Sequence, residues 1–523
     1  MWGDKAMNRT QWATEGSLAK LLQWRVEEDP GREFLYVEDD GPWSYAAIAA
    51  RAVNHHEVLT GLGVGRGDLV IVRVGNDERF PAAAFAAWMA GAAVIAMHPS
   101  APQKDILDIA ESMSPTAIIA DPSDAPAHNS GLAVVDSAPF RPSYDRDILC
   151  AARRFTTPHN VRGEDTALVL LTSGSTGKPK GVVLTHDGAW ANLRATVSAF
   201  RSDTAPTALP HEPKPPNLIA NPLSHTAGVV RLLFALYVGR SVALLRKFNG
   251  AAAKRLIDRH GINNLTINPA MMRMLLDQLP ASEDLGPVRY ASSGTAPLPA
   301  ALREEFESRF GIPVLQAYGQ TEAFGGIAIE SVKDVLSGRR RPGSVGKPLP
   351  GVEVRIVDAS GHDVGQGQVG ELLVRTRSAT TGYLGNDALS PVDGAGWLRT
   401  GDRARTDADG YLYITGRSKN IIICGGFNVV PEELEAALAD DPAVRDAAVV
   451  GVPDARLGEI PVALVESSAN ADAITERVAG QLAPYKRPRR IFIVDELPRV
   501  PNGKVDRPAA TELARNLVAT ISQ

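Results

Sequence analysis

Hydroxyl, glycine and lysine side chains are concentrated in one segment, LTSGSTGKPKGVVLTH at residues 171–186. An apolar run enters this segment, whose backbone N–H groups and hydroxyls can point into one concavity and cradle phosphate oxygens. A P-loop is excluded, because that motif needs Ser or Thr after Gly-Lys to reach magnesium, and Pro179 follows Lys178. A dinucleotide-binding turn is also excluded at residues 61–67, GLGVGRG, because Arg66 stands where the third glycine is needed. The chemistry indicated is phosphate binding by a loop of another kind.

The segment TSGSTGKPKGV at residues 172–182 resembles the phosphate loop of the acyl-adenylate-forming superfamily: acyl-CoA synthetases, adenylation domains of peptide synthetases and beetle luciferases. Further motifs of that superfamily follow in its order: SSGTAPL (292–298), AYGQTEA (317–323), GSVGKPLPG (343–351), WLRTGDRA (397–404), GRSKNIIICGGFNVVPEELE (416–435) and PNGKVDR (501–507). LGVGRGD at 62–68 extends the likeness toward the N-terminus. The resemblance implies an AMP-forming acyl-CoA synthetase that uses ATP, Mg²⁺ and coenzyme A. It would convert a carboxylic acid to acyl-AMP and pyrophosphate, and then to acyl-CoA and AMP.

The resemblance also implies how the nucleotide is held. The carboxylate and the triphosphate are both anions, so their approach requires positive charge and oriented donors. Thr321 would contact the α-phosphate, and Glu322 would hold Mg²⁺, a hard ion that prefers carboxylate oxygen. Asp402 would accept both ribose hydroxyls, with Arg417 beside the same ribose. The remaining nucleotide contacts would come from Thr172, Ser173, Gly174, Ser175, Thr176, Gly177, Lys180, Gly294, Thr295, Ala296, Tyr318 (against the adenine) and Gly319.

Two residues are implied to act on the reacting acid. Lys504, in the C-terminal PNGK turn, would reach the carboxylate and the α-phosphate and stabilise the charge that develops during adenylation. His225, in NPLSHTAG, would close or orient the carboxylate site, and a core histidine bonded to backbone is its structural alternative. For the second half-reaction the C-terminal domain would rotate about Lys419. Gly425 and Gly426 would then line the path of the pantetheine arm, because glycine permits close passage.

The acyl pocket is expected between residues 225–231, 292–294 and 319–326. His225 is its polar residue, and its wall is expected to be made of the small residues Gly228, Ser292, Ser293, Gly325 and Gly326. No charged residue is evident at the expected base of the pocket. We therefore expect a bulky apolar carboxylic acid (aryl, alicyclic or medium-chain) rather than acetate or an amino acid.

Two other functions remain open on the sequence. A stand-alone adenylating enzyme would share the ATP motifs and hand its acyl-AMP to an acyl carrier protein or a separate ligase. A non-catalytic, nucleotide-binding regulatory relative is the other alternative, and intact Lys180, Glu322, Asp402 and Lys504 argue against it.

Composition excludes several classes of protein. The chain has 523 residues, with 55 Lys and Arg against 60 Asp and Glu, so its formal charge is −5. This near balance does not favour nucleic-acid binding, and the basic clusters at 339–341 and 486–490 are short. The two cysteines cannot build a disulfide framework or a structural zinc site. Residues 80–103 carry no Asp, Glu, Lys or Arg, but alanine, Gly91, Pro99 and Pro102 indicate a buried helix and strand rather than a membrane span. We expect a cytoplasmic protein, either monomer or homodimer, with small-molecule substrates and no nucleic-acid or membrane partner.

The elements that must position these motifs follow from periodicity. β-branched runs at 69–73, 116–120, 167–171, 242–245 and 264–267 alternate with amphipathic segments such as 103–113, which predicts layered α/β subdomains with largely parallel strands. Short strands between glycine-bearing turns at 352–357, 370–375 and 411–415 predict a β-rich subdomain. A small mobile α+β unit begins near residue 420. The predicted division is an N-terminal AMP-binding and acyl-binding domain, residues 1–417, and a C-terminal domain with the catalytic lysine, residues 418–523.

Overall fold

A computed structural model of the protein describes residues 16–38, 40–121, 133–137, 165–173, 179–200, 215–384, 390–417, 420–424, 427–454, 457–479, 481–482, 486–501 and 503–521. No helix among them is both long and apolar enough to cross a membrane.

A seven-stranded sheet of order β18-β8-β7-β4-β3-β5-β6 forms the centre of the N-terminal body. Its strands are β3 (Leu69–Arg73), β4 (Ala93–Ala96), β5 (Ala117–Ala120), β6 (Ala133–Asp136), β7 (Thr166–Ser173), β8 (Pro179–Thr185) and β18 (Gly382–Leu384). The strands from β7 to β6 are parallel, and β8 and β18 are added antiparallel at one edge. All of β3 is buried, as expected of a parallel strand covered on both faces.

Helices cover both faces of this sheet. They are α1 (Ala19–Glu28), α2 (Tyr45–Gly61), α3 (Arg79–Met89), α4 (Gln103–Met113) and α5 (His186–Phe200). One face packs against apolar residues of α1, α2, α3 and α5, and the other packs against Ile106, Ile109 and Met113 of α4. The apolar spacing on α4 directs these three side chains to the same side of the helix.

Two further sheets continue the body. One has the order β2-β1-β10-β9 and contains β1 (Glu33–Val37), β2 (Asp40–Ser44), β9 (Asn217–Ile219) and β10 (Val242–Leu244). The other runs in chain order through β11 (Asn264–Thr266), β12 (Tyr290–Ser293), β13 (Val314–Gln320), β14 (Gly325–Ile329) and β15 (Lys347–Pro348). Because β11, β12 and β13 are parallel, their carboxyl ends lie at one edge, where ligands of α/β proteins commonly bind.

The helices of these sheets are α6 (Thr226–Tyr237), α7 (Gly250–His260), α8 (Pro269–Gln278), α9 (Ala300–Phe310) and the short α10 (Val332–Leu336). Local sequence explains their starts. Asn249 caps α7 and Asn268 caps α8, each side chain accepting a bond from a backbone N–H of the first turn, and Pro269 fits the first position of α8.

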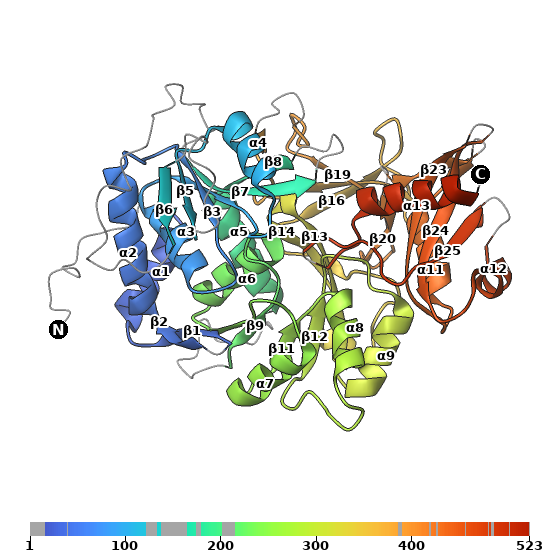
Figure 1. Ribbon diagram of the computed structural model, residues 1–523, viewed down its shortest axis with the longest axis horizontal. Coiled ribbons are helices and arrows are strands. Elements are labelled where there is room, and N and C mark those ends of the chain that lie inside the picture. The colour runs from blue at the N-terminus through green and yellow to red at the C-terminus, as the bar shows by residue number, and fades with distance from the viewer. Residues whose placement is uncertain are drawn as a thin grey trace.

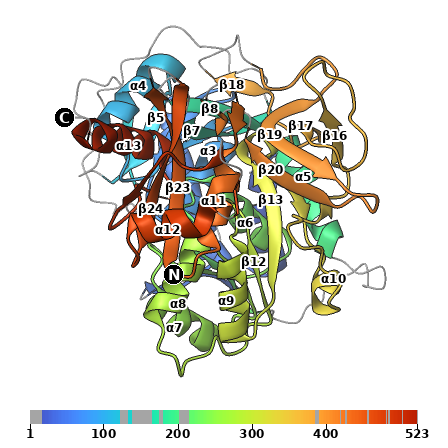
Figure 2. The ribbon, with the colours of Figure 1, turned by 90° about the vertical axis from the view of Figure 1, so that its right-hand side faces the viewer.

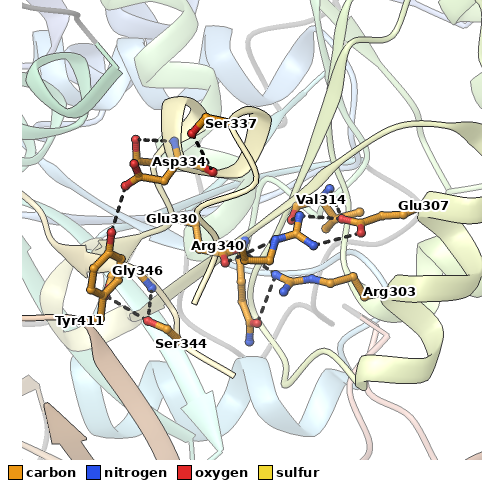
Figure 3. A network of polar contacts seen from close by, with 12 residues as sticks. Arg303, Glu307, Val314, Glu330, Asp334, Ser337, Arg340, Ser344, Gly346 and Tyr411 are labelled. Carbon is orange, nitrogen blue, oxygen red and sulfur yellow. Dashed lines mark hydrogen bonds and ion pairs between the residues drawn. The ribbon is translucent and has the colours of Figure 1, made fainter. Parts of the chain in front are cut away.

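An antiparallel four-stranded sheet follows, of order β16-β17-β19-β20, with β16 (Glu353–Val357), β17 (Gly370–Arg375), β19 (Leu398–Thr406) and β20 (Leu412–Arg417). A polar network joins it to the preceding sheet (Figure 3). Arg303 and Glu330 form a buried ion pair at 2.7 Å, and Arg340 contacts Glu307 at 2.7 Å. Ser344 donates a hydrogen bond to the carbonyl of Leu412 at 2.9 Å. The network fixes residues 330–346 against both α9 and β20.

The C-terminal unit is a mixed sheet of β22-β21-β24-β23, with β25 paired parallel to β24. Its elements are β21 (Ile422–Cys424), β22 (Phe427–Val429), α11 (Pro431–Ala439), β23 (Val444–Asp454), β24 (Gly458–Ser467), α12 (Ala471–Ala479), β25 (Arg490–Ile493) and α13 (Arg507–Ile521). One apolar cluster includes residues of α11 and α12, and a separate cluster includes residues of α13. The unit therefore has its own core. Figure 1 shows it at one end of the body, and in Figure 2 it faces the viewer.

The C-terminal unit contacts the body beside α8. Arg445 of β23 donates to Asp277 of α8 at 2.9 Å. Gly503, with φ of +82°, passes so close that an added Cβ would lie 3.3 Å from the Cβ of Ala270. This contact brings the C-terminal turn to the carboxyl edge of the β11–β13 sheet.

The predicted layered α/β body, β-rich subdomain and C-terminal α+β unit are confirmed. The apolar runs at 69–73 and 370–375 coincide with β3 and β17, and the segment 103–113 coincides with α4. The uncharged segment 80–103 holds the buried α3 and β4, as expected. The sequence did not reveal the pairing of β1 with β10, strands that are about 200 residues apart along the chain.

Candidate active site

The phosphate-loop segment begins and ends on paired strands. Thr172 of β7 pairs with Lys180 of β8, and Ser173 is the last residue of β7. The ammonium of Lys180 lies 5.4 Å from the centre of the Tyr383 ring, a cation–π contact. The loop residues predicted between the strands, Gly174, Ser175, Thr176 and Gly177, lie outside the described residues.

The predicted magnesium ligand lies at the turn after β13. A single turn of 3₁₀-helix, η3 (Thr321–Ala323), presents Glu322, whose carboxylate accepts a hydrogen bond from the hydroxyl of Tyr383 at 3.1 Å. Burial and the neighbouring Glu322 raise the pKa of Tyr383, so the phenol remains a donor at neutral pH. The hydroxyl of Thr321 is 2.8 Å from that of Thr226, at the start of α6. The turn is thus bonded to β18 on one side and to α6 on the other.

The donor set at Glu322 fits Mg²⁺. Among the described residues no cluster of three or more His, Cys, Asp or Glu could form an all-protein metal cage. Mg²⁺ keeps several waters and is commonly held by one or two carboxylates together with the phosphates of a nucleotide. A single carboxylate, that of Glu322, suits this mode.

The predicted ribose site is a buried carboxylate shared by three strands. Asp402 on β19 is 2% exposed and accepts hydrogen bonds from the hydroxyl of Tyr318 on β13 and from Nε of Arg417 on β20, the latter at 2.7 Å. Asp402 and Arg417 are direct partners in the β19–β20 ladder. Burial, reinforced by Asp402, raises the pKa of Tyr318 well above its usual range, which keeps the phenol protonated. The sequence predicted Tyr318 against adenine, and the structure adds a hydrogen bond from Tyr318 to Asp402, the predicted ribose ligand.

Thr295, predicted in the adenine slot with Gly294 and Ala296, has an unusual backbone. Its φ is +72°, in the left-handed region that a β-branched residue rarely adopts. Its hydroxyl is buried and has no hydrogen-bond partner among the described residues. Strain together with an unpaired buried donor is typical of a ligand site.

Lys504 reaches this site from the C-terminal unit. Its carbonyl accepts from the N–H of Val500 at 2.9 Å, closing the turn that carries it. Burial and the nearby Arg417 lower the pKa of Lys504 to about 8, while Asp402 and Glu322 oppose that shift. The predicted catalytic lysine is therefore close in space to the predicted ribose and magnesium ligands, which are 102 and 182 residues away in the sequence.

His225 is the N-cap of α6. Its Nδ1 accepts a hydrogen bond from the N–H of Ala227 at 3.2 Å, which leaves the proton of the neutral ring on Nε2. Burial, with a smaller effect of Lys504, lowers the pKa of His225 to about 4. His225 is thus a neutral hydrogen-bond donor near Lys504 rather than a cation.

The small residues predicted for the acyl pocket do not all need an acyl chain to explain them. Gly228 packs on the backbone, since an added Cβ would be 2.2 Å from the carbonyl oxygen of Pro222. Ser292 and Ser293 are buried at the end of β12. A close backbone contact also accounts for Gly319, predicted to contact the nucleotide, where an added Cβ would be 1.9 Å from the carbonyl oxygen of Gly325.

A cavity at this edge bears on the predicted acyl pocket. It is lined by Asn221, Ala227, Arg231, Thr266, Ile267, Asn268, Gly294 and Thr295. The sequence suggested no charged residue at the base of the acyl pocket, and the lining of this cavity includes Arg231. Arg231 marks one end of a range predicted to border the pocket, but spacing alone does not show which helical residues face inward.

Sequence reasoning missed three residues of the site: Thr226, Arg231 and Tyr383. Tyr383 contacts both Lys180 and Glu322 although it is 61 residues from the latter, because β18 pairs with β8. Until that strand pairing is known, nothing about a tyrosine after Thr-Gly predicts that it lies in the site. The predicted hinge Lys419 and the predicted CoA-contacting Gly425 and Gly426 lie outside the described residues.

Comparison with known proteins agrees with this geometry. The family profile described as AMP-binding enzyme matches residues 22–384, and that described as AMP-binding enzyme C-terminal domain matches residues 433–504. A sulfoacetate–CoA ligase of Cupriavidus necator is 31% identical over 514 residues, which cover 95% of this chain and 98% of that protein.

Two solved structures are similar over nearly the whole chain. ATP-bound MatB from Rhodopseudomonas palustris has a TM-score of 0.82 and 28% identity, covering 96% of this chain and 100% of its own. The o-succinylbenzoate coenzyme A synthetase MenE from Bacillus subtilis, in complex with ATP and a magnesium ion, has a TM-score of 0.78 and 26% identity, with 93% and 98% covered.

Proposed function

The chain belongs to the AMP-binding enzymes, and we propose that it joins a carboxylic acid to the AMP part of ATP and then transfers the acyl group to coenzyme A. The observation that carries this proposal is the position of Lys504. A lysine from a separately folded C-terminal unit lies beside Asp402, Glu322 and His225, at the carboxyl edge of a parallel sheet. A cation placed among these side chains suits a reaction between two anions, the carboxylate and the triphosphate, because it reduces their mutual repulsion.

In the first half-reaction a carboxylate oxygen attacks the α-phosphorus of ATP. A bond forms between this oxygen and the α-phosphorus. The bond from the α-phosphorus to the oxygen that bridges to the β-phosphorus breaks, and pyrophosphate leaves with that electron pair. Lys180 would neutralise the β- and γ-phosphates, and Glu322 would hold Mg²⁺, which supplies further charge neutralisation when bound. Lys504 would stabilise the charge on the carboxylate and the α-phosphate, and Nε2–H of His225 would orient the carboxylate.

In the second half-reaction the sulfur of coenzyme A attacks the acyl carbon, and AMP leaves as the mixed anhydride bond breaks. We infer that residues 418–523 rotate relative to residues 1–417 about Lys419, so that Lys504 withdraws and Gly425 and Gly426 reach the thiol path. The contact between Arg445 and Asp277 supports a reversible arrangement. Both side chains are more than a third exposed, and such pairs contribute about 0–1 kcal/mol.

The identity of the carboxylic acid that is activated is a separate question. Sequence reasoning predicts a bulky apolar acid on the basis of small pocket residues. The relative from Cupriavidus necator is named for sulfoacetate, which is small and carries two anionic groups. These two classes differ in size and charge, so one panel of acids separates them.

The test is a panel of carboxylic acids incubated with Mg·ATP, with and without coenzyme A, followed by mass detection of acyl-AMP and acyl-CoA. We expect acyl-AMP and pyrophosphate without coenzyme A, and acyl-CoA with AMP when it is present. Formation of ADP and phosphate would contradict the adenylate route. Acyl-AMP that never reacts with coenzyme A would instead point to an acyl carrier protein or a separate ligase as the acceptor.

A further inference from the structure

Arg231 occupies an unusual position in the candidate acyl site. It lies on α6 one helical turn after Ala227, and both residues line the cavity at the carboxyl edge of β11 and β12. Residues 266–268, Gly294 and Thr295 line the same cavity. Arg231 therefore borders the space where the acid is expected to bind.

Arg231 also lacks the partners that other arginines of this protein have. Its Nε is buried without a hydrogen-bond partner, and no hydrogen bond or ion pair joins its guanidinium to any described residue. By contrast, Arg25 donates from Nε to the carbonyl of Leu236 at 2.7 Å and from Nη2 to that of Tyr237 at 2.8 Å. Arg231 is partly buried, and charges withdrawn from water are normally paired, so the missing partner of Arg231 calls for an explanation.

The groups around Arg231 supply no counter-charge. Its electrostatic partner among the described residues is Tyr290, at the start of β12, and Arg240 acts on the same tyrosine. Burial outweighs both cations and raises the pKa of Tyr290, so the phenol is neutral at ordinary pH. Burial lowers the pKa of Arg231 to about 10, and the side chain therefore remains a cation at neutral pH.

The rest of the lining is mixed, with polar side chains beside Ala227 and Ile267. Asn221, Thr266 and Asn268 border the same cavity, and the Oδ1 of Asn221 is buried without a described partner. A bulky apolar acyl group at this position would leave Oδ1 of Asn221 and the guanidinium of Arg231 desolvated and unpaired, at a cost of roughly 1–3 kcal/mol for the neutral group and more for the charge.

We propose that Arg231 binds a second anionic group, a carboxylate or a sulfonate, at the far end of the acid that this enzyme activates. This inference rests on the proposed function and identifies its substrate class as short acids with an anionic end. A guanidinium binds either group through paired N–H donors. His225 and Arg231 are six residues apart, about 9 Å along the helix axis. The acid must therefore be short.

The test compares acids matched in size. Succinate and 3-sulfopropionate are paired with butyrate, and glutarate with valerate, each at saturating Mg·ATP and coenzyme A. The measured quantities are kcat/KM from pyrophosphate release, the acyl-CoA formed, and the KM for ATP. We expect the wild-type protein to favour the anionic member of a pair by at least about 100-fold, as loss of one partner of a desolvated charge pair predicts.

Variants separate recognition from folding. Arg231→Met should lower kcat/KM for the anionic acids by about 100- to 1,000-fold while leaving that for butyrate and valerate, and the KM for ATP, within about 3-fold. Arg231→Lys should restore roughly a tenth of the activity, because the charge returns without the two-pronged geometry. Arg240→Met is the matched control, since Arg240 is held by Asn217 at 2.8 Å and does not line the cavity.

Two results would overturn the inference, and they are distinguishable from failure of the proposed function. One is a wild-type protein that activates butyrate or valerate as well as their anionic partners. The other is an Arg231→Met variant that loses activity on both classes equally. In either case acyl-CoA would still form and the ligase function would stand. If no acid of any class yields acyl-AMP or acyl-CoA, the proposed function fails and this inference fails with it.

Discussion

Replacing Lys504 by alanine removes the cation that lies beside Asp402 and Glu322, and its effect follows from the surroundings of that cation. Burial and Arg417 lower the pKa of Lys504 to about 8 from 10.5. Holding the ammonium charged before the substrates bind therefore costs about 3 kcal/mol. Anions that arrive at the site recover this energy, most of all where charge develops between the carboxylate and the α-phosphate. Removing one such preorganised group lowers kcat by about 10²–10³-fold, and we expect a loss of that size in adenylation.

The assay is acid-dependent exchange of labelled pyrophosphate into ATP, which reports adenylation alone. The KM for ATP should change by less than about 3-fold, because the phosphate loop and the ribose carboxylate are untouched. Chemically prepared acyl-AMP should be converted to acyl-CoA at close to the wild-type rate. Lys486→Ala is the matched control, since Lys486 lies on the same unit in a partly exposed pair with Glu433 at 2.6 Å. Exchange at the wild-type rate in Lys504→Ala, or equal loss in both half-reactions, would refute the reasoning.

Three further predictions follow from the same site. The kcat/KM for adenylation should fall as pH rises through about 8, because Lys504 is a cation only below that value. His225, with a pKa of about 4, should add no step between pH 5 and 8. A pH profile that is flat from 7 to 10 would contradict this prediction. Gly503→Ala should slow adenylation by roughly 5- to 30-fold and spare thioester formation from acyl-AMP. A side chain at φ of +82° costs about 1–2 kcal/mol, and its Cβ would press on Ala270 of α8. Equal slowing of the two steps would contradict this prediction. Tyr383→Phe should lower kcat/KM for Mg·ATP by about 10-fold, because it removes the hydrogen bond to Glu322, the proposed magnesium ligand. Tyr411→Phe is the matched control, since it removes a tyrosine–carboxylate bond, to Asp334, outside the candidate site. Similar effects of the two changes would exclude a specific role for Tyr383.

Sequence reasoning reached the architecture because its signals are local. The strand at 69–73 and the helix at 103–113 each have one period and clear boundaries, and the structure has the same bounds. Pairing between distant segments is not local. The β1–β10 and β18–β8 ladders bring together residues about 200 apart along the chain, and nothing in either segment alone specifies the partner.

In the candidate site, too, some residues could be predicted from the sequence and others depended on the three-dimensional packing. Motif order identified Asp402, Glu322 and Lys504 as one group, and the structure brings all three together. The position of Arg231 could not be predicted from motif order. Which residues of α6 line the cavity depends on the rotation of the helix in its packing, so only the structure shows Arg231 among the lining residues.

The most direct test of the central claim follows the carboxylate oxygen. An acid labelled with ¹⁸O in its carboxylate is converted to acyl-CoA with unlabelled ATP, and the AMP, pyrophosphate and any ADP or phosphate are analysed by mass. Because the carboxylate oxygen attacks the α-phosphorus and stays with it when the thiol displaces AMP, the account predicts one ¹⁸O in AMP and none in pyrophosphate. Label in inorganic phosphate, with ADP as the other product, would contradict it.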